Sequence, residues 1–145
     1  SAASDVYKRQ VNKTPITVEG KQYTIWAWKG DYINLGAGAE TGIYQEGIGD
    51  HWFTAKDYAQ KMELTLTDQS NNQIMSYEPK EKQWWINGFN PQYQNVQARD
   101  LKATTKIYFS DSEEDLSMWN ALINDKGAAK KWKFDEENRI ATLTW

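Results

Sequence analysis

The chain has 145 residues, with 17 basic and 20 acidic side chains and a formal net charge of -3. It is long enough for one hydrophobic core but offers no basic field for phosphates, so nucleic-acid binding is disfavoured. It has no cysteine, and His51 is its single histidine. This excludes disulfides, cysteine-ligated zinc and multi-histidine metal sites, and we predict neither a metal nor a cofactor.

The first ten residues, SAASDVYKRQ, resemble the translation of sequencing-adapter DNA at the edge of a gene fragment. We predict that residues 1–10 are not native, that residues 11–145 form a single β-rich domain, and that any natural leader or anchor is missing. No stretch of the chain reaches the roughly 18 consecutive apolar residues that a membrane-spanning helix needs.

Extended patterns dominate the first half of the chain. Five segments are predicted as strands, at 15–19, 22–29, 40–45, 61–67 and 73–77. In the second of these, Trp26 and Trp28 share one face while the other face is also apolar, so we expect a central strand covered on both sides. In the fourth, apolar and polar residues alternate strictly, which predicts a half-exposed antiparallel strand.

The second half adds four predicted strands, at 83–89, 101–109, 131–134 and 139–145. One helix is predicted over 111–124, because Ser110 and Glu113 have the spacing of a capping box and three acids follow in the first turn. Its apolar stripe consists of Leu116, Trp119 and Ile123, with Leu122 beside it.

These elements define a fold class. About eight strands joined by short turns, with one helix late in the chain, predict a mostly β fold of the α+β type. We expect an antiparallel β-sandwich or an open barrel, with the helix of about 111–124 packed on an end or a face.

Three ordered motifs resemble a known family. WKGDY at 28–32, GAETGIY at 38–44 and WWINGF at 84–89 are similar to the elements of an uncharacterised bacterial family of Firmicutes, domain of unknown function 4474. The similarity covers about residues 23–125. The resemblance implies a secreted or cell-surface location, and it carries over no catalytic residue, because the family has no assigned activity.

Four residues are candidates for catalysis. Lys29, Asp31 and Glu40 lie in or beside a glycine-rich loop, where a carboxylate paired with a lysine could perform acid-base chemistry. The alternative is that Lys29 and Glu40 form an ion pair holding two strands together. His51 beside Asp50 could act as a general base, or it could be a histidine with a purely structural hydrogen bond.

Aromatic and amide side chains are candidates for ligand binding, because rings on a sheet face can stack on sugars. The predicted ligand-binding residues are Trp28, Tyr44, Trp52, Trp84, Trp85 and Asn87. Core packing is the alternative for the tryptophans, and Trp84 and Trp85 must point away from each other if they lie on one strand.

The leading functional hypothesis is a non-catalytic binding or interaction module outside the cytoplasm, with a carbohydrate or cell-wall polymer as the first partner to test. One alternative is a hydrolase with a carboxylate site around Glu40. Another is a module that contacts a membrane surface through its tryptophans. The sequence leaves the oligomeric state open.

Overall fold

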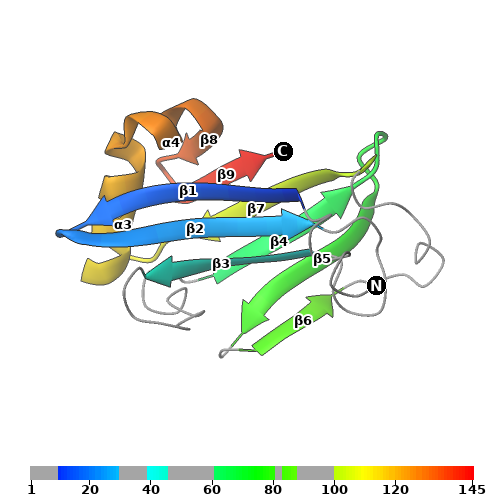
Figure 1. The fold of residues 1–145 in the computed structure, drawn as a ribbon, viewed down its shortest axis with the longest axis horizontal. Coiled ribbons are helices and arrows are strands. Elements are labelled where there is room, and N and C mark those ends of the chain that lie inside the picture. The colour runs from blue at the N-terminus through cyan, green and yellow to red at the C-terminus, as the bar shows by residue number, and fades with distance from the viewer. Residues whose placement is uncertain (1–9, 30–38, 46–60, 81–82, 88–99) are drawn as a thin grey trace.

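The computed structural model describes residues 10–29, 39–45, 61–80, 83–87 and 100–145. Within these ranges, nine strands form two antiparallel sheets, and two helices follow the seventh strand (Figure 1). Neither sheet closes on itself, so the prediction of a mostly β antiparallel fold is confirmed as a sandwich of two open sheets.

The smaller sheet is built from β1 (Gln10–Val18), β2 (Lys21–Lys29) and β3 (Ala39–Gln45), in that order. As predicted, β2 is the central strand. The strand expected at 15–19 is longer and begins at Gln10. The turn from β1 to β2 places both Glu19 and Gly20 at positive φ, 51° and 81°, the backbone that matches the twist of a two-residue hairpin.

The larger sheet has the order β6-β5-β4-β7-β9-β8. Its strands are β4 (Lys61–Thr67), β5 (Gln73–Lys80), β6 (Gln83–Asn87), β7 (Lys102–Tyr108), β8 (Trp132–Asp135) and β9 (Ile140–Thr144). The strand predicted at 61–67 has the predicted bounds, with Met62, Leu64 and Leu66 buried and the intervening residues that are described half-buried. Asp68 ends β4 by accepting backbone N–H groups of Ser70 and Asn72.

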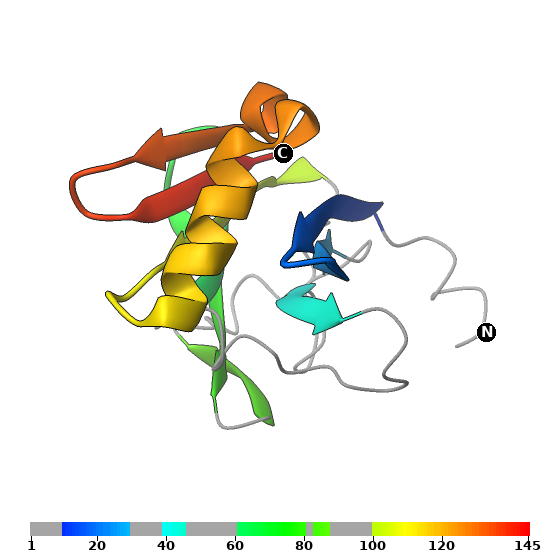
Figure 2. The same ribbon diagram turned by 90° about the vertical axis from the view of Figure 1, so that its left-hand side faces the viewer.

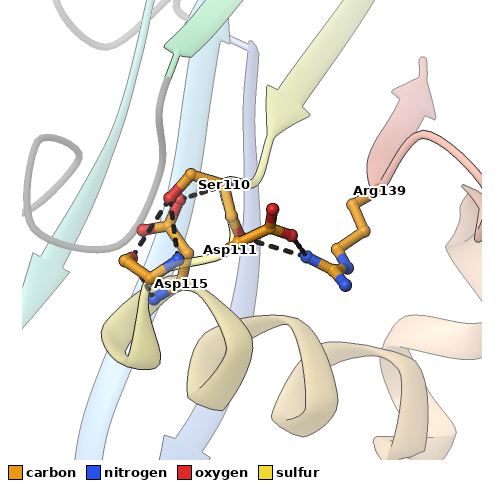
Figure 3. Close-up of polar contacts among 5 residues, drawn as sticks. Ser110, Asp111, Asp115 and Arg139 are labelled. Carbon is orange, nitrogen blue, oxygen red and sulfur yellow. Dashed lines mark hydrogen bonds and ion pairs between the residues drawn. The ribbon is translucent and has the colours of Figure 1, made fainter.

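Helix α3 (Glu113–Asn124) lies where a helix was predicted, but its cap differs. Ser112, not Ser110, is the N-cap, and its hydroxyl accepts from the backbone N–H of Asp115 at 3.1 Å. The Asp115 carboxylate in turn accepts from the backbone N–H of Ser110 at 2.6 Å (Figure 3). The predicted capping box of Ser110 and Glu113 is therefore wrong. The N-cap is Ser112, two residues later, and Asp115 is the acid that accepts a backbone hydrogen bond at the start of the helix.

The buried face of α3 also differs from the predicted stripe. Met118, Trp119 and Leu122 are buried, whereas Leu116 and Ile123 are only half-buried. A short second helix, α4 (Lys126–Lys131), was not predicted. It follows directly because Asp125 ends α3 and caps α4, its carboxylate accepting from the backbone N–H of Ala128 at 2.9 Å.

One core joins both sheets and the helices. Its buried side chains come from β1, β2 and β3, from β4, β7 and β9, and from α3, α4 and β8. Figure 2 shows α3 lying across one end of the sandwich, between the two sheets. There the Trp119 ring makes edge-to-face contacts with Phe109 and Phe134, at centroid distances of 5.5 Å and 5.7 Å. This end of the sandwich is closed by apolar packing.

Candidate functional site

A buried lysine links the two sheets. Lys29, the last residue of β2, is 4% exposed, and its Nζ donates to the backbone oxygen of Leu101 at 2.5 Å. The same Nζ lies 5.2 Å from the centroid of the Trp145 ring, a cation–π contact. Leu101 precedes β7 and Trp145 follows β9, so the side chain of Lys29 crosses from the smaller sheet to the larger one.

The environment of Lys29 disfavours its charge. Burial lowers the pKa of the Lys29 ammonium below its ordinary value, and the nearby negative charge of Asp100 offsets this only in part. Titratable groups perturbed by burial occur frequently at functional sites, which makes Lys29 a candidate on physical grounds.

A second polar contact joins the sheets further along β1, at Thr14, whose register partner is Ile25. The indole Nε1 of Trp132 on β8 donates to the hydroxyl of Thr14 on β1 at 2.9 Å, and both groups are buried. Asn12 lies on β1 between Thr14 and Gln10, and Gln10 is the register partner of Lys29. Since alternate residues of a strand face the same side, Asn12 faces the larger sheet between these two contacts.

Two atoms in this region lack hydrogen-bond partners among the described residues. They are the side-chain oxygen Oδ1 of Asn12 and the indole Nε1 of Trp145, and both atoms are fully buried. A third, the Thr105 hydroxyl, lies on β7 in the apolar core. We refer to Asn12, Thr14, Lys29, Trp132 and Trp145 together as the polar end of the sandwich. Unpaired buried polar atoms are uncommon and require an explanation.

The outward side of the smaller sheet carries two tryptophans, of which one is half-buried and the other buried. Val11 and Glu40 are the register partners of Trp28, Lys13 and Gly42 those of Trp26, and Pro15 and Tyr44 those of Thr24. Trp28 is half-buried, Trp26 is 8% exposed, and Val11 is 52% exposed. We call this surface the outer face; it contains Val11, Lys13, Pro15, Thr24, Trp26 and Trp28.

The catalytic candidates are not assembled by the described residues. Lys29 has Ala39 as its register partner on β3, whereas Glu40 is paired with Trp28. The register therefore does not place Lys29 opposite Glu40, and the hydrogen bond of Lys29 goes to Leu101. Asp31 and His51 lie outside the described residues, and so does the side chain of Glu40.

The ligand-binding candidates are placed only in part. Trp28 lies on the outer face, as described above. Tyr44 is a residue of β3, and Trp84, Trp85 and Asn87 are residues of β6, but their side chains are outside the described part of the structure. Trp52 is outside it altogether.

The sequence did not single out Asn12, Thr14, Trp132 or Trp145. One signal was available for Lys29, because it continues the inward-facing series of Tyr23, Ile25 and Ala27 at a spacing of two. The partners of Lys29 could not be identified from sequence, since β7 and β9 reach it only through the packing of the two sheets.

The described ranges contain no group of three or more His, Cys, Asp or Glu side chains that could hold a metal ion. Among the same residues, neither helix has the length and apolar character needed to cross a membrane.

A comparison with protein families gives one finding. A family model described as a domain of unknown function (DUF4474) matches residues 10–144, almost the whole chain. No curated protein and no solved structure matches the chain.

Proposed function

The chain belongs to the DUF4474 family, and from this premise we propose that it is a non-catalytic binding module whose ligand is a glycan or cell-wall polymer. The proposal includes a secreted or cell-surface location on a bacterium.

The outer face is the observation that carries the proposal. Trp28 is half-buried near the end of β2, the central strand of the smaller sheet, next to the strongly exposed Val11, and the buried Trp26 lies two residues away on the same strand. The half-buried Trp28 indole beside the exposed Val11 side chain offers a partly exposed platform on which a sugar ring can stack. Among the described residues, Val11 is the exposed large apolar side chain, and it lies opposite Trp28 in the register.

The chemistry of the described residues favours binding over catalysis. Lys29, the buried titratable group of the site, donates to a backbone carbonyl and is not opposite Glu40 in the register. Acid-base catalysis requires the acid and base to lie within hydrogen-bond reach of one reacting group.

A glycan array, followed by isothermal titration with peptidoglycan fragments and bacterial polysaccharides, tests the proposal. For a bound glycan, we expect Trp28→Ala to weaken binding about tenfold, equivalent to about 1.4 kcal/mol. The matched control is Thr17→Ala, which changes an exposed residue of β1 far from Trp28. Circular dichroism of both variants confirms that the sheets are intact.

Other outcomes would contradict the proposal. If no glycan binds, the glycan ligand is wrong. Release of shortened oligosaccharides would favour the hydrolase with Glu40 instead. Retention of the protein on liposomes in flotation, with no glycan binding, would favour the membrane-contacting module.

A further inference from the structure

Lys29 is a buried cation whose hydrogen-bonding capacity is largely unused. Its ammonium group has three N–H donors, and among the described residues one of them is bound, by the carbonyl of Leu101. No carboxylate in the described ranges hydrogen-bonds to it, and Asp100 acts on it only through its charge. A buried charge without a hydrogen-bonded counterion is costly, which is a reason to expect an anionic partner from outside the chain.

The neighbours of Lys29 add a donor and an acceptor. The buried Nε1 of Trp145 can donate, and the buried Oδ1 of Asn12 can accept, and neither atom has a partner among the described residues. Trp145 is in contact with Lys29 through its ring. Asn12 is two residues from Gln10, the register partner of Lys29, and faces the same side of the sheet.

This arrangement lies just below the surface. Asn12 and Trp145 are half-buried as residues, and both Gln10 and Asp100, which flank Lys29, are exposed. The residues around the Lys29 ammonium are therefore partly open to solvent, although Lys29 itself is buried.

We propose that the polar end of the sandwich binds the carboxylate of an acidic sugar, such as a uronic acid. The carboxylate accepts hydrogen bonds from Lys29 Nζ and Trp145 Nε1, and a neighbouring hydroxyl of the sugar donates to Asn12 Oδ1. The inference rests on the proposed glycan-binding function and narrows its ligand to glycans that carry carboxylates. Charge-assisted hydrogen bonds of this kind are short and strong.

The test is an NMR titration of the intact chain, observing the indole N–H resonance of Trp145, which is assigned by its loss in Trp145→Phe. We expect sodium glucuronate to shift this resonance with saturation, and glucose at equal concentration to leave it in place. The same titration on Lys29→Met should lose the shift. Lys21→Met, which removes an exposed lysine at the other end of β2, should retain it.

A second variant tests the same site in case Lys29→Met loses the shift only because it does not fold. Asn12→Val removes the acceptor and leaves Lys29 in place, so it should weaken glucuronate binding while acetate binding changes little. Folding of every variant is judged from the dispersion of the amide spectrum.

Three results would overturn the inference. One is a Trp145 resonance that glucuronate does not move, and another is an equal response to glucose. The third is an equal affinity for acetate or free glutamate, which would indicate a general carboxylate site and no sugar selectivity. Failure of the outer-face proposal is distinct: wild type and Trp28→Ala would bind the glycan with equal affinity, while the Trp145 resonance would still respond to glucuronate and not to glucose.

Discussion

The charge of Lys29 has a thermodynamic consequence that can be measured. Because burial lowers the pKa of this ammonium in the folded state, the unfolded chain holds the proton more tightly over the pH range between the lowered pKa and the ordinary lysine pKa of 10.5. In that range the unfolded state binds more protons, so the free energy of unfolding rises with pH. Below this pH range Lys29 is charged in both the folded and the unfolded state, and the full cost of burying its charge lowers the free energy of unfolding.

We therefore expect the stability of the wild type relative to Lys29→Met to increase as the pH rises from 7 toward 10.5. Urea unfolding curves at several pH values measure this difference. The difference between wild type and Lys21→Met, an exposed lysine, should change much less over the same range. If the stability difference between wild type and Lys29→Met does not change with pH, burial does not disfavour the charge of the Lys29 ammonium.

Of the residues in the polar end, the sequence predicted a functional role for Lys29 alone. It selected Lys29 from its position beside a glycine-rich loop, but it offered Asp31 and Glu40 as partners because those acids are near in sequence. The observed partners, Leu101 and Trp145, are distant in sequence and are brought to Lys29 by the stacking of two sheets. A strand pattern predicts which face a residue takes but not which strand packs against it.

At the scale of elements, the start of α3 depends on a serine pair whose roles the sequence could not separate. Ser110 and Ser112 are both helix-capping residues by type, and each is followed three residues later by an acid. The structure selects Ser112, and Ser110 supports it by accepting from the Ser112 backbone N–H at 3.2 Å.

Ser112→Ala should lower the free energy of unfolding by about 1 kcal/mol, since it removes the acceptor for an exposed helix N-terminus. Ser110→Ala should cost less, because the hydrogen bond from its backbone N–H to Asp115 survives the substitution. Chemical denaturation of the two variants compares them directly. A larger loss for Ser110→Ala would mean that the cap lies where the sequence first suggested.

The strands were easier to predict than the helix ends. Strict alternation gave β4 its observed bounds, because its buried and half-buried residues follow the pleat of the strand. Helix α4 was missed because it has only six residues and contains Gly127, and glycine is a residue type common just past the end of a helix. The second helix can follow without a linker because Asp125 is both the C-cap of α3 and the N-cap of α4.

At the scale of the whole molecule, both sheets and both helices share one core. Leu122 of α3 is fully buried in that core, whereas Leu116 on the same helix is half-buried. A cavity at Leu122 should therefore weaken the packing of both sheets and both helices, because all of them contribute side chains to this core.

Leu122→Ala should lower the free energy of unfolding by about 2 to 5 kcal/mol, and Leu116→Ala by clearly less. Far-UV circular dichroism and tryptophan fluorescence of Leu122→Ala should report the same urea midpoint, as in a two-state transition. Separate midpoints for the two probes would contradict a single shared core.

The hydrogen bond between Thr14 and Trp132 joins residues 118 positions apart in the chain. While the protein is being synthesised, the β1–β2 hairpin can form early around its two-residue turn, but its apolar side has no complete partner until β8 and β9 have left the ribosome. Non-local pairings of this kind slow folding. The two sheets are therefore expected to associate late, after most of the chain has been synthesised.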